Sequence, residues 1–298
     1  MRLAAGGVVL LLVAGWLGAL HPAFDSIAHF RHHVLLGGAL VLPALAWLAS
    51  WRSFASLAVV MTVSLAAMWP ALPGLSPDGA TGDFSVAQQN LLYLNVLPEQ
   101  AIETLLAADA DVLLLQEVSI RNAAILRGVA GEYPHATVCR FRKLRSVAVL
   151  SRRPFVGEPL CDGEGGLSAA RIELGGRVIT FASMHSYWPW PYPQWPTIRG
   201  VEDRLRTLPH PLVLGGDFNA APWSALVRKV ARETRTDLVP GFRFTFNLRI
   251  LQNGDSRFGG LPLDHILHSP ELKPTAVRLL PHVGSDHLGT LARFAFAG

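Results

Sequence analysis

Charged side chains and cysteines are both scarce in this chain. Charged residues make up 16% of the 298 residues, whereas about 25% is usual in soluble proteins. The only cysteines are Cys139 and Cys161, and no CxxC pair occurs, so we do not expect a metal site built on cysteine. The formal net charge of +4 suits phosphorylated substrates, nucleic acid or anionic lipid, and does not choose among them.

The shortage of charge is concentrated at the N-terminus. The first 72 residues contain only four charged side chains, Arg2, Asp25, Arg31 and Arg52. Three apolar stretches lie in this segment, at residues 3–20, 34–49 and 54–72. Since about 20 apolar residues span a bilayer and roughly 17 suffice, we predict a membrane segment over residues 1–72 with about three transmembrane helices. The alternatives are a signal peptide in the first stretch, or one anchor followed by two buried core helices.

The basic residues of this segment predict its orientation. Short cytoplasmic loops carry more Lys and Arg than outer loops, and Arg2 and Arg52 would share one side while Arg31 lies on the other. This distribution favours a cytoplasmic N-terminus, so three crossings would place the large domain outside the cytoplasm. Residues 73–83 are rich in proline, glycine and aspartate and are predicted to form the linker to that domain.

From residue 84 to residue 298, strands and helices alternate. Apolar runs bounded by turn residues predict strands at residues 84–94, 111–117, 135–141, 147–151, 169–174, 178–184, 212–216, 263–268, 273–279 and 289–296. Helices are predicted at residues 99–108, 123–130, 199–208 and 223–232. Because several predicted strands follow one another without an intervening helix, antiparallel pairing is expected and a purely parallel sheet is excluded.

The strand at residues 212–216 runs into the sequence Gly-Gly-Asp-Phe-Asn, which carries Asp217 and Asn219. Residues two apart at a strand end point the same way, so this carboxylate and this amide should project together. The carboxylate can orient a water or take its proton, and the amide can hold a developing negative charge. An ordinary turn in which the Asp side chain bonds to the backbone explains the same sequence equally well.

Polar residues of the same kinds border the other predicted strands. They are Asn90, Gln116, Glu117, His185, Asp264 and the triplet Ser285-Asp286-His287. One such residue is usually a turn residue, but six strand ends that each carry an acid, amide or imidazole indicate a functional site. Acids and histidines together suit metal-assisted phosphoryl chemistry.

The order and spacing of these motifs resemble those of the endonuclease/exonuclease/phosphatase superfamily, the DNase-like hydrolases. The resemblance extends from residue 84 to the C-terminus. It implies an α/β (α+β) domain built as a four-layer αββα sandwich, with two mostly antiparallel sheets packed face to face and helices outside. The leading apolar stretches further resemble the membrane-anchored bacterial branch, which implies a multi-pass protein of the bacterial inner membrane.

The resemblance implies a metal site. It makes Glu117 the principal Mg²⁺ ligand, with Asn90 beside the metal and Asp286 on the metal side, and Mn²⁺ as the expected substitute. Hard oxygen ligands suit Mg²⁺, which takes few carboxylates and keeps several waters. Many of the nucleases carry a second acid two residues past the Asn90 position, where this chain has Leu92. Asn95 is the candidate for that role, and a second firmly held metal is not expected.

The resemblance also implies the catalytic residues. Asp217 matches the residue that orients or deprotonates the attacking water, and Asn219 the one that steadies the transition state. His185 and His287 would flank the scissile phosphate, where a protonated imidazole stabilises its charge. Asp264 would fix His287, because a carboxylate beside an imidazole raises the pKa of the ring and selects its tautomer.

Two stretches bear on the substrate. The loop at residues 186–196 contains three tryptophans, two tyrosines and four prolines. It is either a rigid loop packed on the domain or an interfacial loop, since Trp and Tyr favour the headgroup level of a bilayer. Six basic residues between positions 140 and 153 form either a solvated edge or a site for phosphates and anionic headgroups.

We therefore expect a membrane-anchored, Mg²⁺-dependent phosphoesterase that hydrolyses a lipid-linked phosphate ester or pyrophosphate at the bilayer. A nuclease of the same fold is the alternative, although nucleases need an extended basic surface. The complete residue set disfavours an inactive binding domain, and no obligate protein partner is evident. If the domain lies outside the cytoplasm, Cys139 and Cys161 are candidates for a disulfide.

Overall fold

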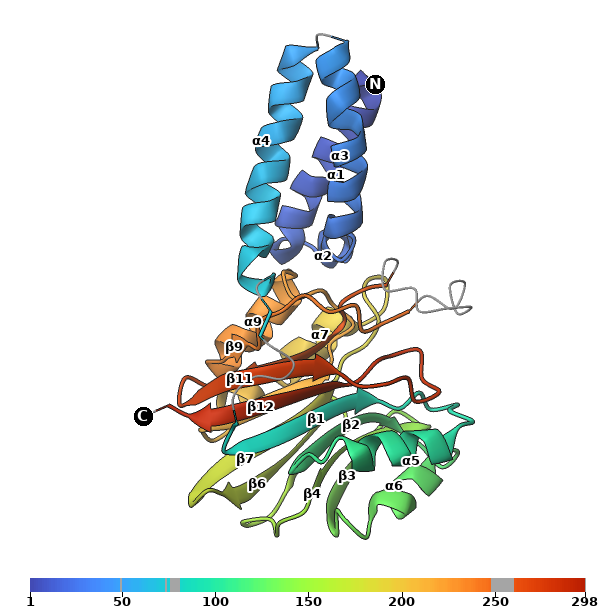
Figure 1. The fold of residues 1–298 in the computed structure, drawn as a ribbon, viewed down its shortest axis with the longest axis vertical. Helices are drawn as coiled ribbons and strands as arrows, with labels where there is room; N and C mark the ends of the chain where they lie inside the picture. Colours follow the sequence, from blue (N-terminus) through green and yellow to red (C-terminus); the bar gives the residue numbers. More distant parts are fainter. Residues whose placement is uncertain (49, 73, 76–80, 248–259, 298) are drawn as a thin grey trace.

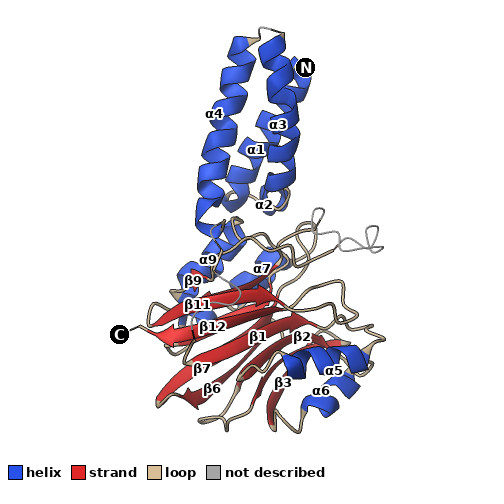
Figure 2. Cartoon of the chain, in the orientation of Figure 1, coloured by secondary structure: helices blue, strands red, loops and turns tan. Residues whose placement is uncertain are grey.

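The chain folds into a group of N-terminal helices and a larger part made of two β-sheets with covering helices (Figures 1 and 2). The computed structural model describes residues 1–48, 50–72, 74–75, 81–247 and 260–297. Most of the predicted linker, residues 73–83, lies outside the described residues.

The helical part consists of α1 (Arg2–Trp16), α2 (Pro22–Ala28), α3 (Arg31–Trp47) and α4 (Trp51–Met68). Short 3-10 helices, Leu17–Ala19 and Trp69–Ala71, follow α1 and α4. α1, α3 and α4 run side by side, with the N-terminus at the end remote from the sheets (Figure 1). The short α2, which was not predicted, lies at the opposite end and begins with a proline, whose fixed φ suits a first helical position.

Two segments of the helical part are long and apolar enough to cross a membrane. They are Arg2–Ala19 and Trp51–Ala71, and signal sequences and buried core helices share these properties. α3 has 17 residues and carries Pro43 in its interior, so at 1.5 Å per residue it is about 25 Å long. The three predicted apolar stretches therefore do form helices, but the middle one is not among the two segments long and apolar enough to cross a membrane.

The first sheet has six strands in the order β11-β12-β1-β2-β4-β3. Their bounds are β1 (Phe84–Asn90), β2 (Val112–Val118), β3 (His135–Phe141), β4 (Arg145–Ser151), β11 (Leu272–Leu279) and β12 (Thr290–Phe296). β1 and β2 are parallel, and the other neighbours are antiparallel. A parallel pair needs a crossover connection, which α5 (Pro98–Ala107) provides; α5 and α6 (Ala123–Val129) cover the outer face of this sheet (Figure 1).

The second sheet has six strands in the order β5-β6-β7-β8-β10-β9. Their bounds are β5 (Leu160–Asp162), β6 (Leu167–Leu174), β7 (Arg177–His185), β8 (Leu212–Asp217), β9 (Asp237–Leu238) and β10 (Asp264–His268). β7 and β8 form its one parallel pair. Their crossover contains α7 (Gln194–Gly200) and α8 (Glu202–Arg206), which cover the outer face together with α9 (Ala225–Thr234).

An apolar layer between the two sheets holds them together. Val86 and Leu114 of the first sheet are fully buried against Phe181 and Val213 of the second. Two further clusters pack the helices onto the outer faces, and burial of apolar surface stabilises each layer by roughly 25 cal/mol per Å². The predicted order of helix, sheet, sheet and helix is confirmed, and both sheets are mixed.

Specific contacts hold the helical part against the sheet part. Asp25 of α2 is only 1% exposed and accepts hydrogen bonds from the backbone N–H groups of Ala225 (2.6 Å) and Leu226 (3.1 Å). A carboxylate at this first turn of α9 satisfies free N–H groups and complements the helix dipole. Trp223 Nε1 donates to the Ala28 carbonyl at 2.7 Å. The two parts are therefore in direct contact, which the composition of the linker did not predict.

A disulfide between Cys139 of β3 and Cys161 of β5 joins the edge strands of the two sheets. These are the two cysteines named above as candidates for a disulfide, and their Cα atoms are 5.2 Å apart.

Some predicted boundaries were wrong. The helix expected over residues 199–208 is two short helices, α7 and α8. The strand expected over residues 84–94 ends at Asn90, because Leu92 has a left-handed φ of 57° and its N–H bonds to Asn90 Oδ1. β5 and β9 were missed, since strands of three and two residues are too short to show an alternating pattern.

Candidate active site

Strand ends from both sheets bring the predicted site residues together. In the parallel pair β1/β2, Asn90 lies beside Gln116, and in β7/β8, His185 lies beside Asp217. β10 runs antiparallel to β8, so its first residue, Asp264, lies opposite Asp217. The two sheets meet at this edge, where Asn90 Nδ2 donates to Asp217 Oδ2 at 3.0 Å.

Asp217 is the centre of the site. Its Oδ2 lies 3.4 Å from His185 Nε2 and 3.7 Å from His287 Nε2. Burial alone would raise the pKa of Asp217, but His287 and His185 lower this pKa to about 2. The carboxylate is therefore ionised at neutral pH and can accept hydrogen bonds from a water or hold a cationic partner.

Asn219 is positioned by a turn that few residue types tolerate. Its φ is 48°, in the left-handed region that Asn adopts more readily than most residues. Its backbone N–H donates to Asp217 Oδ1 at 2.8 Å, and its Nδ2 lies 3.3 Å from Asp217 Oδ2 and 3.1 Å from the Ser186 carbonyl. Both amide and carboxylate thus face one point, as the Gly-Gly-Asp-Phe-Asn motif predicted.

His287 and Asp264 form a buried pair. His287 Nδ1 lies 2.8 Å from Asp264 Oδ2. Burial would lower the pKa of His287, but Asp264 and Asp217 raise it to about 10; burial raises the pKa of Asp264. Thr245 Oγ1 accepts the Asp264 backbone N–H at 3.0 Å, and Gln88 Nε2 donates to Asp264 Oδ1 at 2.9 Å. The pair thus carries a protonated imidazole held in one orientation.

Glu117 stands on a strained backbone at the end of β2. Its φ is 56°, an uncommon value for a residue other than glycine and one often found at functional sites. Asn122 Nδ2 donates to the Glu117 carbonyl at 2.9 Å and so supports this turn. The Glu117 carboxylate accepts the Tyr93 backbone N–H at 2.9 Å and pairs with Arg145 Nη1 at 2.8 Å. A nearly buried carboxylate is costly without a partner of opposite charge, and Arg145 supplies that partner.

A cavity of about 340 Å³ connects these groups. Glu117, Asp286, Asp217, Asn219 and His287 all line it, so both carboxylates that the resemblance placed at the metal open into the same space as the catalytic groups. Hard oxygen donors of this kind fit Mg²⁺. Asp217, Asp264 and His287 also offer three ligand atoms within 4.8 Å of one another, which is a second place where a divalent ion fits.

Asn95 does not take part in the site, contrary to expectation. Its Nδ2 donates to the carbonyls of Leu91 (2.9 Å) and Val283 (2.7 Å), and its Oδ1 accepts the Leu97 N–H at 2.8 Å. The side chain is therefore committed to the loop after β1. Gln116 points between the sheets and donates to Ser183 Oγ at 2.9 Å, so it supports the site from beneath.

Several residues of the site were not predicted as such. Arg145 was known only as part of a basic stretch, yet it bonds to Glu117. Tyr93, Gln88 and Thr245 carry no motif, and Phe246, whose ring centroid lies 4.9 Å from that of His287, is far from it in sequence. The aromatic loop reaches the site through Trp188, which lines the same cavity. No local pattern distinguishes these residues from packing residues.

A family profile described as "Endonuclease/Exonuclease/phosphatase family" matches residues 87–287, about two thirds of the chain. The chain belongs to this family. Together with the acid, amide and imidazole groups gathered at the strand ends, membership makes it a metal-dependent hydrolase of phosphoester bonds.

Several solved structures have a fold similar to that of this chain, although their sequence identity to it is low. An endonuclease/exonuclease/phosphatase from Bacteroides vulgatus matches with a TM-score of 0.60 and 13% identity, over 72% of this chain and 99% of that one. D. rerio TDP2 complexed with a single-strand DNA product matches at 0.57 and 19%, over 71% and 98%. Sphingomyelinase C from Streptomyces griseocarneus matches at 0.50 and 17%, over 71% and 99%. No curated protein matches the chain in sequence.

Proposed function

We propose that this hydrolase cleaves a lipid-linked phosphate ester or pyrophosphate presented at a membrane surface. The observation that carries the proposal is the position of the aromatic loop. Trp188 lines the catalytic cavity, and the exposed Trp190 has its ring centroid 6.3 Å from that of His21, the residue that precedes α2 of the helical part. The loop therefore bridges the catalytic cavity and the base of the helices, where Trp and Tyr suit the headgroup level.

The catalytic roles follow from the geometry. The ionised Asp217 orients the attacking water, and Asn90 and Asn219 hold that carboxylate in place. As the water oxygen bonds to phosphorus and the ester P–O bond breaks, the protonated His287 stabilises the charge on the phosphate and can give a proton to the leaving oxygen. Asp264 keeps this imidazole charged and oriented.

Glu117 and Asp286, with Asn90 beside them, are the residues that we propose hold Mg²⁺, for which Mn²⁺ would substitute. The ion supplies Lewis-acid neutralisation of the phosphate oxygens when bound. The cluster of Asp217, Asp264 and His287 is the less suitable place, because an imidazole protonated up to a pKa of about 10 has no lone pair free for a metal at neutral pH.

The surface of the helical part supports the membrane assignment. Large apolar side chains such as Leu10 of α1, Leu40 of α3 and Val59 of α4 are exposed, and extensive exposed apolar surface marks a membrane or protein contact. α3 packs against α1 and α4, so if those two cross a bilayer, α3 crosses beside them. We therefore propose a multi-pass inner-membrane protein with three crossings.

Charge and cysteine chemistry support an extracytoplasmic catalytic part. Arg2 Nε donates to Ser50 Oγ at 3.1 Å, so Arg2 and the neighbouring Arg52 share the end of the bundle remote from the sheets (Figure 1). Arg31, the basic residue at the other end, is buried with the acidic Asp25 nearby and contributes little to the outer charge. This distribution favours a cytoplasmic N-terminus, and the disulfide fits an oxidising compartment.

An activity panel tests the proposal. The full-length protein in nanodiscs is assayed with Mg²⁺ or excess EDTA on lipid phosphates and pyrophosphates in bilayers, on nucleotides, and on single- and double-stranded DNA. We expect Mg²⁺-dependent hydrolysis of the lipid substrates. The names of two similar structures, a sphingomyelinase and a TDP2 bound to a DNA product, show why both classes belong in the panel. A preference for DNA would replace this proposal by the nuclease alternative.

A loop variant separates membrane presentation from chemistry. Trp195, the third tryptophan of the predicted loop, belongs to α7 and is buried in the core, so it is left unchanged. Trp190→Ala/Tyr192→Ala removes two exposed rings and should depress hydrolysis in bilayers far more than hydrolysis of a short soluble phosphodiester. Trp51→Ala, at the remote end of the bundle, is the matched control. Equal losses on both substrates would mean that the loop only supports the fold.

A further inference from the structure

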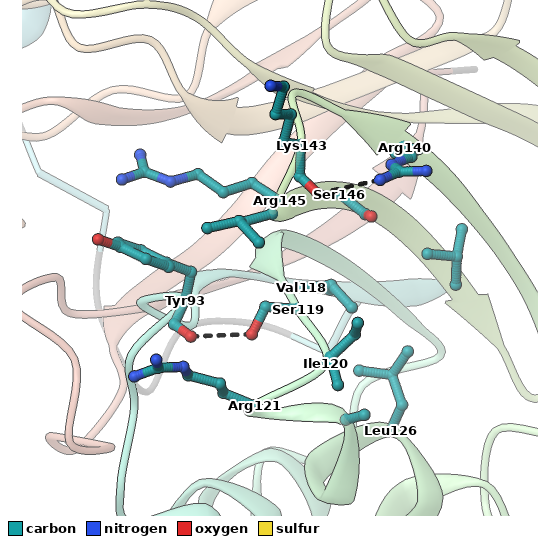
Figure 3. Close-up of a pocket in the computed structure, with 13 residues that line it drawn as sticks. Tyr93, Val118, Ser119, Ile120, Arg121, Leu126, Arg140, Lys143, Arg145 and Ser146 are labelled. Carbon is teal, nitrogen blue, oxygen red and sulfur yellow. Dashed lines mark hydrogen bonds between the residues drawn. The ribbon is translucent and has the colours of Figure 1, made fainter.

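A second and larger cavity lies next to the catalytic one. It has a volume of about 700 Å³ and lies between the end of β2, the helix α6 and the turn that joins β3 to β4 (Figure 3). This volume falls within the range of roughly 300–1,000 Å³ that is usual for small-molecule sites. Hydrogen bonds shape the walls: Ser119 Oγ donates to the Tyr93 carbonyl at 2.8 Å, and Arg140 Nη2 donates to the Lys143 carbonyl at 3.1 Å.

The charges on the wall of this cavity have one sign. Arg121, Arg140, Lys143 and Arg145 line it, and none of the described residues brings a carboxylate to its lining. Arg121 and Lys143 form no ion pair with the residues that the structure describes. Arg145 is paired with Glu117, but unpaired basic side chains such as Arg121 and Lys143 attract an anion, and Arg in particular matches the geometry of phosphate oxygens.

Exposed apolar side chains also border the cavity. Ile120 is 94% exposed, Leu144 is 64% exposed and Val138 is half-exposed, and all three line the cavity. In Figure 3, Arg121 and Arg145 project to one side, while Ile120 and Leu126 lie toward the other. A contiguous exposed apolar patch beside fixed cations marks a ligand site, and the arrangement fits a ligand that is anionic at one end and apolar at the other.

The cavity shares a wall with the catalytic one. Tyr93 and Arg145 line both cavities, and the Arg145 guanidinium lies 4.2 Å from the Tyr93 ring centroid while it pairs with Glu117. The second cavity therefore borders the centre in which a scissile phosphorus would lie beside Glu117.

The position of the cavity decides which part of the substrate enters it. α6, which forms one wall, lies at the end of the sheet part opposite to the helices α1, α3 and α4 (Figure 1). The aromatic loop lies on the side of those helices. A substrate anchored in the bilayer would therefore pass its water-exposed portion, and not its lipid chains, toward this cavity.

We propose that this cavity binds the water-soluble part of the substrate, a small organic group that carries a second phosphate and an apolar ring or chain. The inference rests on the proposed hydrolysis of a membrane-presented phosphoester or pyrophosphate and names the group on the far side of the scissile bond. Hydrolysis of a pyrophosphate adds one water across the P–O–P bond. It leaves one phosphate on the lipid and one on the soluble group, and the basic side chains around the cavity supply positive charge for the second.

Binding without turnover tests the proposal. The full-length protein in nanodiscs is titrated calorimetrically in excess EDTA with phenylphosphonate, whose C–P bond resists hydrolysis, and with methylphosphonate and benzyl alcohol. We expect phenylphosphonate to bind at least about tenfold more tightly than either other probe, since only it has both an anionic and an apolar end. Arg121→Glu/Lys143→Glu and, separately, Leu144→Asp should each weaken phenylphosphonate binding about tenfold, a difference of about 1.4 kcal/mol.

A charge-matched control isolates the cavity. Arg171→Glu/Arg293→Glu makes the same charge change at two exposed positions on strands outside it and should leave phenylphosphonate binding unchanged. Equal binding to the wild type and to both cavity variants overturns the proposal, as does a single-stranded oligonucleotide that binds more tightly and displaces phenylphosphonate. Lipid-phosphate hydrolysis is measured on the same preparations. If it persists while phenylphosphonate fails to bind, only this inference fails; if phenylphosphonate binds but no lipid phosphate is cleaved, only the proposed function fails.

Discussion

The helical part and the sheet part of this protein differ in which side chains they bury and which they expose. In the sheet part, apolar clusters are enclosed between four layers, and the catalytic groups lie at one edge. In the helical part, Leu10, Leu40 and Val59 are exposed, whereas the charged Asp25 and Arg31 are buried. A soluble domain follows the first pattern because water favours polar surfaces, and the second pattern suits helices whose surroundings are apolar.

The difference between the two parts is greatest where they meet. Asp25 reaches from α2 into the first turn of α9, and Met68 of α4 packs with Trp223 and Ala221 of the sheet part. A charge buried at this junction is stabilised by the backbone N–H groups it accepts from. The junction therefore fixes where the catalytic cavity stands relative to the helices, and each variant below either separates the two parts or tests one alone.

The largest effect is expected inside the sheet part, at the metal. Glu117→Ala should abolish metal-dependent turnover, because a bound metal supplies several kcal/mol of transition-state stabilisation. Hydrolysis is measured with and without Mg²⁺, and the exposed Glu173→Ala serves as the control. Full activity of the wild type in excess chelator would contradict the metal requirement.

His287 should set the alkaline limit of activity. His287→Ala, and likewise His185→Ala or Asp217→Asn, should lower kcat by about 10²–10⁴-fold. In the wild type the His287 pKa of about 10 keeps the ring charged at neutral pH. Asp264→Asn removes a charge that raises this pKa, while burial still lowers it, so the alkaline limb of the kcat profile should move to lower pH. If the alkaline limb of Asp264→Asn coincided with that of the wild type, Asp264 would not be the residue that raises the pKa of His287.

The same pKa has a consequence for stability. It lies above the ordinary value of 6.5, so the folded state holds the proton more tightly than the unfolded state does. The contribution of His287 to the free energy of unfolding is therefore complete below pH 6.5 and is lost as pH rises toward 10. Thermal unfolding of the wild type and His287→Ala across this range should converge at high pH.

The disulfide should contribute a smaller amount, again within the sheet part. Closing a loop with a sequence separation of 22 residues stabilises a fold by about 3 kcal/mol through the unfolded state. Cys139→Ala/Cys161→Ala should therefore lower the unfolding temperature of the sheets and leave the helical part unaffected. Mass spectrometry of the unreduced protein checks the bond directly, and free thiols at both positions would refute it.

The smallest effect is expected at the junction, where a side chain of the helical part bonds to the sheet part. Asp25→Ala removes the carboxylate that accepts the N–H groups of Ala225 and Leu226, which should cost about 1–2 kcal/mol by analogy with helix caps. Ser224→Ala removes the cap within α9 itself, where Ser224 Oγ accepts the Val227 N–H at 3.1 Å, and should cost about 1 kcal/mol.

The two variants separate in a second measurement. Only Asp25→Ala should increase protease sensitivity between the helices and the sheets, because of these two side chains only that of Asp25 reaches from one part to the other. Equal protection in both variants would show that the apolar contacts around Trp223 suffice to hold the junction.

Local patterns in the sequence predicted much of the secondary structure. The strands β3 and β11 and the helices α5 and α6 lie within one residue of their predicted bounds, because apolar runs and turn residues are read over a few neighbouring positions. The motif residues at the strand ends were found for the same reason. The family resemblance supplied the pairing of the sheets, which no local pattern contains.

The parts that sequence reasoning missed all depend on contacts between distant segments. Arg145 pairs with Glu117 across 28 positions and Gln88 bonds to Asp264 across 176, and neither residue differs locally from one that only packs. The helix expected at residues 199–208 was divided by a turn at Val201, a residue buried in the core of the second sheet, where packing outweighs helix propensity.

The sequence by itself determined which acids, amides and imidazoles follow the strands and therefore gather at one edge of the sheets. Only the tertiary structure decided how they act together. It placed Asp217 between two imidazoles, so that its pKa falls to about 2, and joined Asp264 to His287, whose pKa rises to about 10. It also brought Asp25 to α9 and Ile120 to a basic cavity. Charge interactions and desolvation depend on distances in space, and distances between residues far apart in the chain follow from packing alone.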